Sequence, residues 1–174
     1  MAAPTPVSAL VHSSTLVTAG IYLVYRHLII SECSSNYILI IIFFSMAVIT
    51  ILIARIAALY EKDVKKIIAY STLSQLGVMG IGLGIRLENL AFNHLLVHAF
   101  FKALLFICAG DIIHLRNFYQ NINKIRVSPL TSNILRSRVV LRRAGLSALP
   151  FISSYYSKEI ILETSLSQSF SLGE

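Results

Sequence analysis

The sequence predicts an all-α integral membrane protein, and three observations lead to this prediction. Of the 174 residues, 56% are hydrophobic and only 13% are charged. The mean hydropathy is +0.74, which is high for a soluble protein. Several apolar stretches also reach the roughly 20 residues that a helix needs to cross the hydrocarbon core of a bilayer. We therefore expect one transmembrane region that covers residues 1–174.

Four apolar stretches predict four transmembrane helices within residues 1–113. Their approximate bounds are Val7–Ile30, Tyr37–Tyr60, Lys66–Ile85 and Leu90–Ile113. The third stretch contains polar side chains at helical spacing, namely Ser71, Ser74 and Gln75. Its second half is rich in glycine, which favours close packing against other membrane helices over phosphate binding, because no strand precedes it and no Gly-Lys-Ser follows.

The rest of the chain predicts a less regular arrangement. Residues 114–143 form a polar and basic connection, residues 144–163 an interrupted helix and residues 164–174 a tail. In the interrupted helix, Pro150 is followed by small polar residues from Ser153 onward. Such breaks in membrane helices often lie at ion sites.

The formal net charge of +7 indicates orientation in a membrane rather than binding of nucleic acid. Many basic residues lie in the connections after the second and fourth stretches, which should face the compartment of synthesis. They do not form one basic face, so we expect no nucleic-acid partner. Cys33 and Cys108 have neither the spacing of a metal site nor that of a disulfide framework.

The fourth stretch carries the most informative residues, His94, His98 and Lys102. Steps of four place them on one side of a helix, over roughly 12 Å. A lysine near the bilayer centre costs roughly 2.5–3.5 kcal/mol, so it usually faces protein or water and has a function. The pattern predicts a proton relay, with a packing helix as the simpler alternative. Two histidines four apart also form half of a zinc site, but no third ligand follows, so we expect no metal.

Two further sites leave alternatives open. His12 lies in a cluster of serines and threonines, which indicates either hydrogen-bonded helix packing or proton transfer through ordered water. Lys65 and Lys66 are either topology anchors or partners of Glu61 and Asp63, since the pairs Glu61–Lys65 and Asp63–Lys66 have helical spacing. Asp63 is also suited to cap the third helix.

Lys158 follows the predicted helix break and precedes Glu159. It is either a lysine that reaches toward the membrane surface or a group that handles ions. We find no convincing hydrolytic arrangement and no ligand set for haem, flavin or an iron–sulfur cluster. The chain itself is therefore expected to bind no cofactor and to make no covalent bonds.

Four ordered stretches together resemble the chain 5 family of mitochondrial NADH–ubiquinone oxidoreductase, respiratory complex I. They are Pro4–Leu23, Asp63–Gly77, His94–Asp111 and Leu149–Glu159, and the resemblance covers most of Met1–Glu163. It implies an antiporter-like helix bundle with interrupted transmembrane helices, and this chain would be a fragment of a longer subunit. Ser154 and Glu159 replace the glycine and aspartate that are usual in the family.

The resemblance also implies a function. Such subunits move protons across the inner mitochondrial membrane while other subunits oxidise NADH and reduce ubiquinone. The chain would then belong to a proton-translocating NADH:ubiquinone reductase without performing redox chemistry itself. The matching residues of the proton relay are His12, Lys65, His94, His98, Lys102 and Lys158.

The same resemblance implies partners and location. NADH, FMN, iron–sulfur clusters and ubiquinone would be handled by other subunits. The partners would be other membrane-arm subunits, especially the neighbouring antiporter-like chain, and lipids, with cardiolipin as a candidate. The location would be the inner mitochondrial membrane, with several spans. Two alternatives stay open, a subunit of a sodium/proton antiporter complex and a non-conducting structural remnant. Antiporter subunits typically have a lysine where this chain has Thr18, which favours the respiratory enzyme.

Overall fold

The computed structural model describes residues 15–30, 37–115, 119–122 and 153–171, together with residues 7, 11 and 137. Most of the described residues are helical. The helices are α2 (Leu16–Ile30), α3 (Tyr37–Tyr60), α4 (Val64–Gly84), α5 (Glu88–Leu115) and α7 (Ser153–Ser171).

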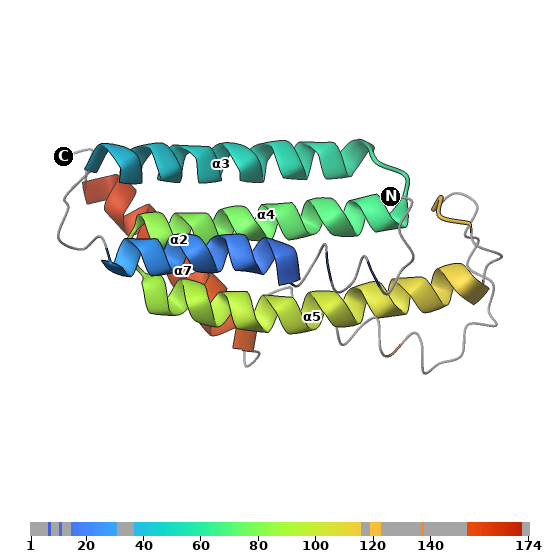
Figure 1. Cartoon of the computed structure of the whole chain (residues 1–174). Helices are drawn as coiled ribbons and strands as arrows, with labels where there is room; N and C mark the ends of the chain where they lie inside the picture. The colour runs from blue at the N-terminus through green and yellow to red at the C-terminus, as the bar shows by residue number, and fades with distance from the viewer. Residues whose placement is uncertain are drawn as a thin grey trace.

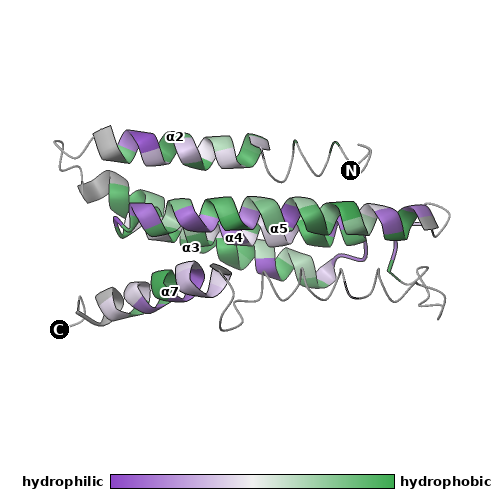
Figure 2. Cartoon of the chain, turned by 90° about the horizontal axis from the view of Figure 1, so that it is seen from below, coloured by the Kyte–Doolittle hydropathy of each residue, from purple (hydrophilic) through white to green (hydrophobic). Residues whose placement is uncertain are grey.

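Three long helices form a layer, and a shorter helix covers each side of it. α4 lies between α3 and α5 (Figure 1). Seen from below, α2 and α7 lie on opposite sides of this layer (Figure 2). Both flanking helices contact α4 and α5. Side chains between α4 and α5 are therefore covered by α2 on one side of the layer and by α7 on the other.

Within the described residues, three segments are long and apolar enough to cross a membrane. They are Ile40–Tyr60, Val64–Gly84 and Glu88–His114. The described helix of the first predicted span is α2, which has 15 residues. At 1.5 Å per residue it reaches roughly 22 Å, less than the roughly 30 Å of the hydrocarbon core. Residues 144–152 of the predicted interrupted helix lie outside the described residues, as do residues 116–118, 123–136 and 138–143 of the predicted connection.

Glycines allow α3 and α4 to approach closely. A Cβ atom on Gly77 would overlap the side chain of Ile51 and lie 2.9 Å from the carbonyl oxygen of Ala47. A Cβ atom on Gly80 would also lie 2.9 Å from the Cβ of Ala47. The glycines of the third stretch therefore serve helix packing, as predicted. Beside them, buried side chains of three helices form an apolar cluster, Ala47, Val78, Ile81 and Ile161.

The start of α4 differs in part from the prediction. Asp63 occupies the N-cap position with an extended backbone, but its side chain makes no capping hydrogen bond. Its carboxylate lies 3.7 Å from the ammonium of Lys66, so the predicted Asp63–Lys66 pair is confirmed and the predicted side-chain cap is wrong. Glu61 also pairs with Lys66, at 3.5 Å. Lys66 therefore pairs with two carboxylates that precede α4.

The connections after α3 and α5 contact each other. Asp63 and Asn121 form an antiparallel β-bridge. The backbone N–H of Val64 donates to the carbonyl of Gln120 at 3.1 Å, and that of Ile122 donates to the carbonyl of Lys62 at 3.0 Å. The two connections therefore lie at the same end of the bundle, as expected for the connections after the second and fourth predicted spans.

Candidate functional site

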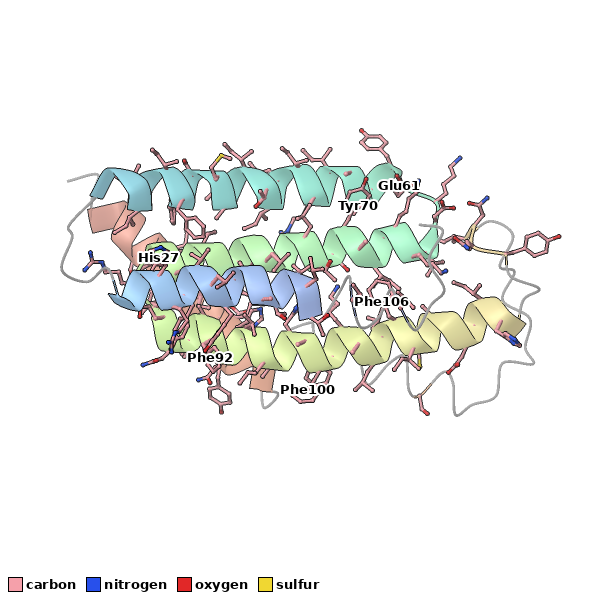
Figure 3. The ribbon with its side chains drawn as sticks, in the orientation of Figure 1. His27, Glu61, Tyr70, Phe92, Phe100 and Phe106 are labelled. Carbon is pink, nitrogen blue, oxygen red and sulfur yellow. The ribbon has the colours of Figure 1, made fainter. Side chains whose placement is uncertain are left out.

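The side chains of His94, His98 and Lys102 lie on the buried side of α5. Their exposed fractions are 3%, 1% and 2%. The ring centroids of the two histidines are 6.2 Å apart. Phe100 is 73% exposed and points out of the bundle from the opposite side of the helix (Figure 3). The ionisable row therefore faces protein, while apolar side chains face outward.

Lys102 is held by α4. Its Nζ donates to the hydroxyl of Ser71 and lies 3.5 Å from the carbonyl oxygen of Ile68. About one turn further along α5, Phe106 points between α4 and α5 and packs with Ile68 and Ala109 (Figure 3). The serine hydroxyl and one backbone carbonyl thus provide hydrogen-bond acceptors for a buried ammonium at the edge of an apolar cluster.

His98 occupies the middle of the row. Both ring nitrogens are fully buried, and neither has a hydrogen-bond partner among the described residues. Buried polar atoms in proteins almost always have a partner, whether protein or ordered water. An imidazole with two buried nitrogens can accept a proton on one and release it from the other.

His94 joins three helices. Its Nδ1 lies 3.0 Å from the hydroxyl of Ser157 on α7. Its Nε2 lies 3.2 Å from Oε1 of Gln75 on α4. The Ser157 hydroxyl is also 3.4 Å from the carbonyl oxygen of Ser154, one helical turn earlier. Both ring nitrogens of His94 are therefore matched to polar groups, in contrast to those of His98.

The other predicted site residues lie around this row. Lys65 is buried in the first turn of α4, three residues before Ile68. Lys158 is half-buried on α7, directly after Ser157. His12 lies outside the described residues. Five of the six predicted residues therefore lie on α4, α5 and α7, the three helices that contact one another at His94.

Three residues at this site were not among the predicted relay residues, namely Ser71, Gln75 and Ser157. A signal was available for two of them, because Ser71 and Gln75 are four residues apart and match the spacing of the row on α5. Nothing in the spacing of α7 identifies Ser157 as the partner of a residue 63 positions away. That contact exists only once the helices are packed.

The sequence profile of a family described as NADH:quinone oxidoreductase/Mrp antiporter, transmembrane, matches residues 1–173. The chain belongs to this family. The antiporter-like helical membrane fold predicted from the sequence is therefore confirmed. Within the described residues of this antiporter-family chain, no group of three or more His, Cys, Asp or Glu side chains could hold a metal ion.

Similar proteins from distantly related organisms all have the same name, NADH-ubiquinone oxidoreductase chain 5. This chain is 46% identical to NADH-ubiquinone oxidoreductase chain 5 of Pongo pygmaeus over 168 residues. The aligned region covers 94% of this chain and 27% of the relative. The protein of that name from Lumbricus terrestris is 46% identical over 95% of this chain and 29% of its own length. The one from Cryphonectria parasitica is 42% identical over 97% of this chain and 25% of its own. The chain thus spans about a quarter of the length of these curated relatives.

Proposed function

We propose that this chain translocates protons as part of a membrane-arm subunit of NADH:ubiquinone oxidoreductase in the inner mitochondrial membrane. Electron transfer in other subunits, which bind NADH, FMN, iron–sulfur clusters and ubiquinone, would supply the energy. The neighbouring membrane-arm subunits, above all the adjacent antiporter-like chain, and lipids would be its partners. The names of the relatives support this assignment.

The observation that carries the proposal is the buried row of Lys102, His98 and His94. Ionisable side chains inside a membrane protein are expensive to bury, so a row of three needs a function. The row lies within a segment long enough to span a bilayer and faces protein instead of lipid. It therefore offers successive proton-binding sites along the direction in which protons would travel.

The polar groups around the row suit proton transfer. Lys102 releases a proton and later binds another. Its ammonium form is then held by the hydroxyl of Ser71 and the carbonyl of Ile68. The ring nitrogens of His98, which have no hydrogen-bond partner among the described residues, accept a proton from one neighbour and release it to the other, between Lys102 and His94. Where two of these groups are too far apart for a direct hydrogen bond, water molecules carry the proton between them. Lys65 and Lys158 add positive charges at α4 and α7 whose repulsion biases where protons rest.

The test replaces Lys102 by alanine in the full-length subunit within the assembled enzyme. We expect Lys102→Ala to abolish proton translocation by this subunit and to lower the number of protons moved per electron. Proton uptake and NADH oxidation are measured in the same sealed membrane vesicles. Lys62→Ala is the matched control, because Lys62 is exposed in the connection after α3. An unchanged proton-to-electron ratio in Lys102→Ala, with normal assembly, would leave the chain as a structural element that conducts nothing.

A sodium/proton antiporter subunit is the second candidate, because the family description also includes the Mrp antiporters. The two candidates differ in what drives transport. Proton movement in the respiratory enzyme requires NADH oxidation, whereas exchange requires a sodium gradient. Vesicles given a sodium gradient without NADH separate them. Proton movement under those conditions that disappears in Lys102→Ala would favour the exchanger.

A further inference from the structure

His94 lies between two groups that differ in hydrogen-bonding capacity. Oε1 of Gln75, 3.2 Å from Nε2, is an amide oxygen and can only accept a hydrogen bond. With the amide in this orientation, Nε2 is the donor and carries the hydrogen. Because neutral imidazole has a single N–H, Nδ1 of neutral His94 has to accept. The group positioned to donate to it is the hydroxyl of Ser157, at 3.0 Å.

Ser157 has two acceptors within reach for one hydroxyl hydrogen. Its Oγ lies 3.0 Å from Nδ1 of His94 and 3.4 Å from the carbonyl oxygen of Ser154. One hydrogen cannot serve both at full strength. The carbonyl is always an acceptor, whereas Nδ1 is an acceptor only while His94 is neutral. The charge on His94 therefore decides where the hydroxyl hydrogen points.

We propose that Ser157 is a positioning residue whose hydroxyl reverses its hydrogen bond each time His94 gains or loses a proton. The inference rests on the proposed proton relay and assigns that relay a sensor on α7. With neutral His94, Ser157 donates to Nδ1. When a proton from the row of His98 and Lys102 reaches Nδ1, the imidazolium donates to Gln75 and to Ser157, and the hydroxyl turns to the Ser154 carbonyl. His94 gains one proton, and Ser157 keeps its own.

The surroundings of His94 direct this change toward Lys158. α4 contributes the neutral Gln75 at this level. Among the described residues, the titratable side chains near this part of α5 include His98 on the same helix, Lys158 on α7, and Tyr22 and Tyr25 on α2, whose rings lie against Phe92. Of these, Lys158 directly follows Ser157, whose hydroxyl lies 3.0 Å from Nδ1 of His94. A proton on His94 therefore repels the Lys158 ammonium and rearranges hydrogen bonds on the same turn of α7.

The sequence makes the Ser154 carbonyl observable on its own. Ser154–Tyr155 is the only place in the chain where tyrosine follows serine. Serine labelled with ¹³C at the carbonyl and tyrosine labelled with ¹⁵N thus give one directly bonded ¹³C–¹⁵N pair. Solid-state NMR of the full chain in lipid bilayers, with ¹⁵N-labelled histidine in a parallel sample, follows the Ser154 carbonyl and His94 as the pH changes. The His94→Gln variant identifies the His94 signals.

We expect the Ser154 carbonyl resonance to move in step with the protonation of His94. Ser157→Ala should remove this movement while His94 still titrates, and Ser157→Thr, which keeps the hydroxyl, should retain it. Ser165→Ala is the matched control, since the Ser165 hydroxyl bonds to the carbonyl of Leu162 two turns further along α7. The inference is overturned if the movement persists in Ser157→Ala or is absent while His94 titrates. It is also overturned if His94 keeps one protonation state throughout the pH range in which the chain stays folded.

This result is separate from that of the transport test. If the carbonyl resonance fails to follow His94 while Lys102→Ala abolishes proton translocation, Ser157 is no sensor and the proposed function stands. If the resonance follows His94 while Lys102→Ala translocates protons normally, the proposed function fails and the hydroxyl reversal remains. In the full-length subunit, the sensor predicts fewer protons per electron for Ser157→Ala than for Ser157→Thr.

Discussion

The ammonium of Lys102 on α5 donates a hydrogen bond to the hydroxyl of Ser71 on α4. These residues are 31 positions apart in the sequence, and both helices are long enough to span a membrane. The bond ties the most deeply buried cation of the site to the neighbouring helix. Ser71 thereby holds the Lys102 ammonium in position, although serine itself carries no charge.

Ser71→Ala should impair both stability and transport. Among the described residues, the ammonium would keep only the carbonyl of Ile68, at 3.5 Å. Loss of a hydrogen bond to a charged group costs about 1.5–3 kcal/mol. We expect a lower midpoint of thermal unfolding in detergent and slower proton translocation in the full-length subunit. Ser71→Thr should restore much of both. Ser74→Ala is the control, because its hydroxyl bonds to the carbonyl of Ser71 within its own helix. Equal effects at both positions would contradict a special role of Ser71.

Lys65 and Lys66 are adjacent in the sequence but should respond differently to mutation. Lys65 is 5% exposed, whereas the side chain of Lys66 is 43% exposed and pairs with carboxylates at the surface. Surface ion pairs contribute roughly 0–1 kcal/mol, so Lys66→Ala should change the free energy of unfolding little. Lys65→Ala removes a buried side chain and should cost about 1–3 kcal/mol. Denaturant titration of both variants measures the difference, and a larger loss for Lys66→Ala would contradict the assignment.

The placement of His94, His98 and Lys102 could be predicted from the sequence because it follows from helical periodicity. Steps of four placed His94, His98 and Lys102 on one side of a helix, and the cost of exposing them to lipid placed that side toward protein. Both inferences are local, and the structure confirms them by the burial of all three side chains.

Contacts between helices could not be predicted in the same way. The bond from Ser157 to His94 depends on the angle at which α7 crosses α5, which no spacing in either helix determines. The cap at Asp63 failed for a related reason. The local pattern allows a capping bond and an ion pair, and the structure has only the ion pair.

Gly77→Ala should weaken the contact between α3 and α4. The added methyl group would overlap Ile51 and lie 2.9 Å from the backbone carbonyl of Ala47, which cannot move without shifting the helix. Overpacking of this kind typically costs about 1–3 kcal/mol. Gly20→Ala on α2 is the matched control, because no atom lies within 4 Å of its added Cβ. Since alanine favours helix over glycine, the control should be neutral or more stable by up to about 1 kcal/mol. Comparable losses in the two variants would show that the close approach is unimportant.

Arg86→Gly should stabilise the end of α4. The helix closes with two backbone bonds, from the N–H of Arg86 to the carbonyl of Leu83 at 3.1 Å and from the N–H of Leu87 to the carbonyl of Gly82 at 2.9 Å. This pattern places Arg86 in the left-handed region, with φ of 64°. A side chain costs about 1–2 kcal/mol there, whereas glycine adopts the conformation freely.

The gain should be about 1 kcal/mol, because glycine also loses more backbone entropy on folding. Arg86→Ala separates conformation from charge, since alanine removes the guanidinium but keeps the strained backbone. Arg86 is exposed, so neither change disturbs the core. Denaturant titration in detergent should rank the glycine variant above both the arginine and the alanine chains. If alanine stabilises as much as glycine, the effect comes from the lost charge and the backbone at Arg86 carries no strain.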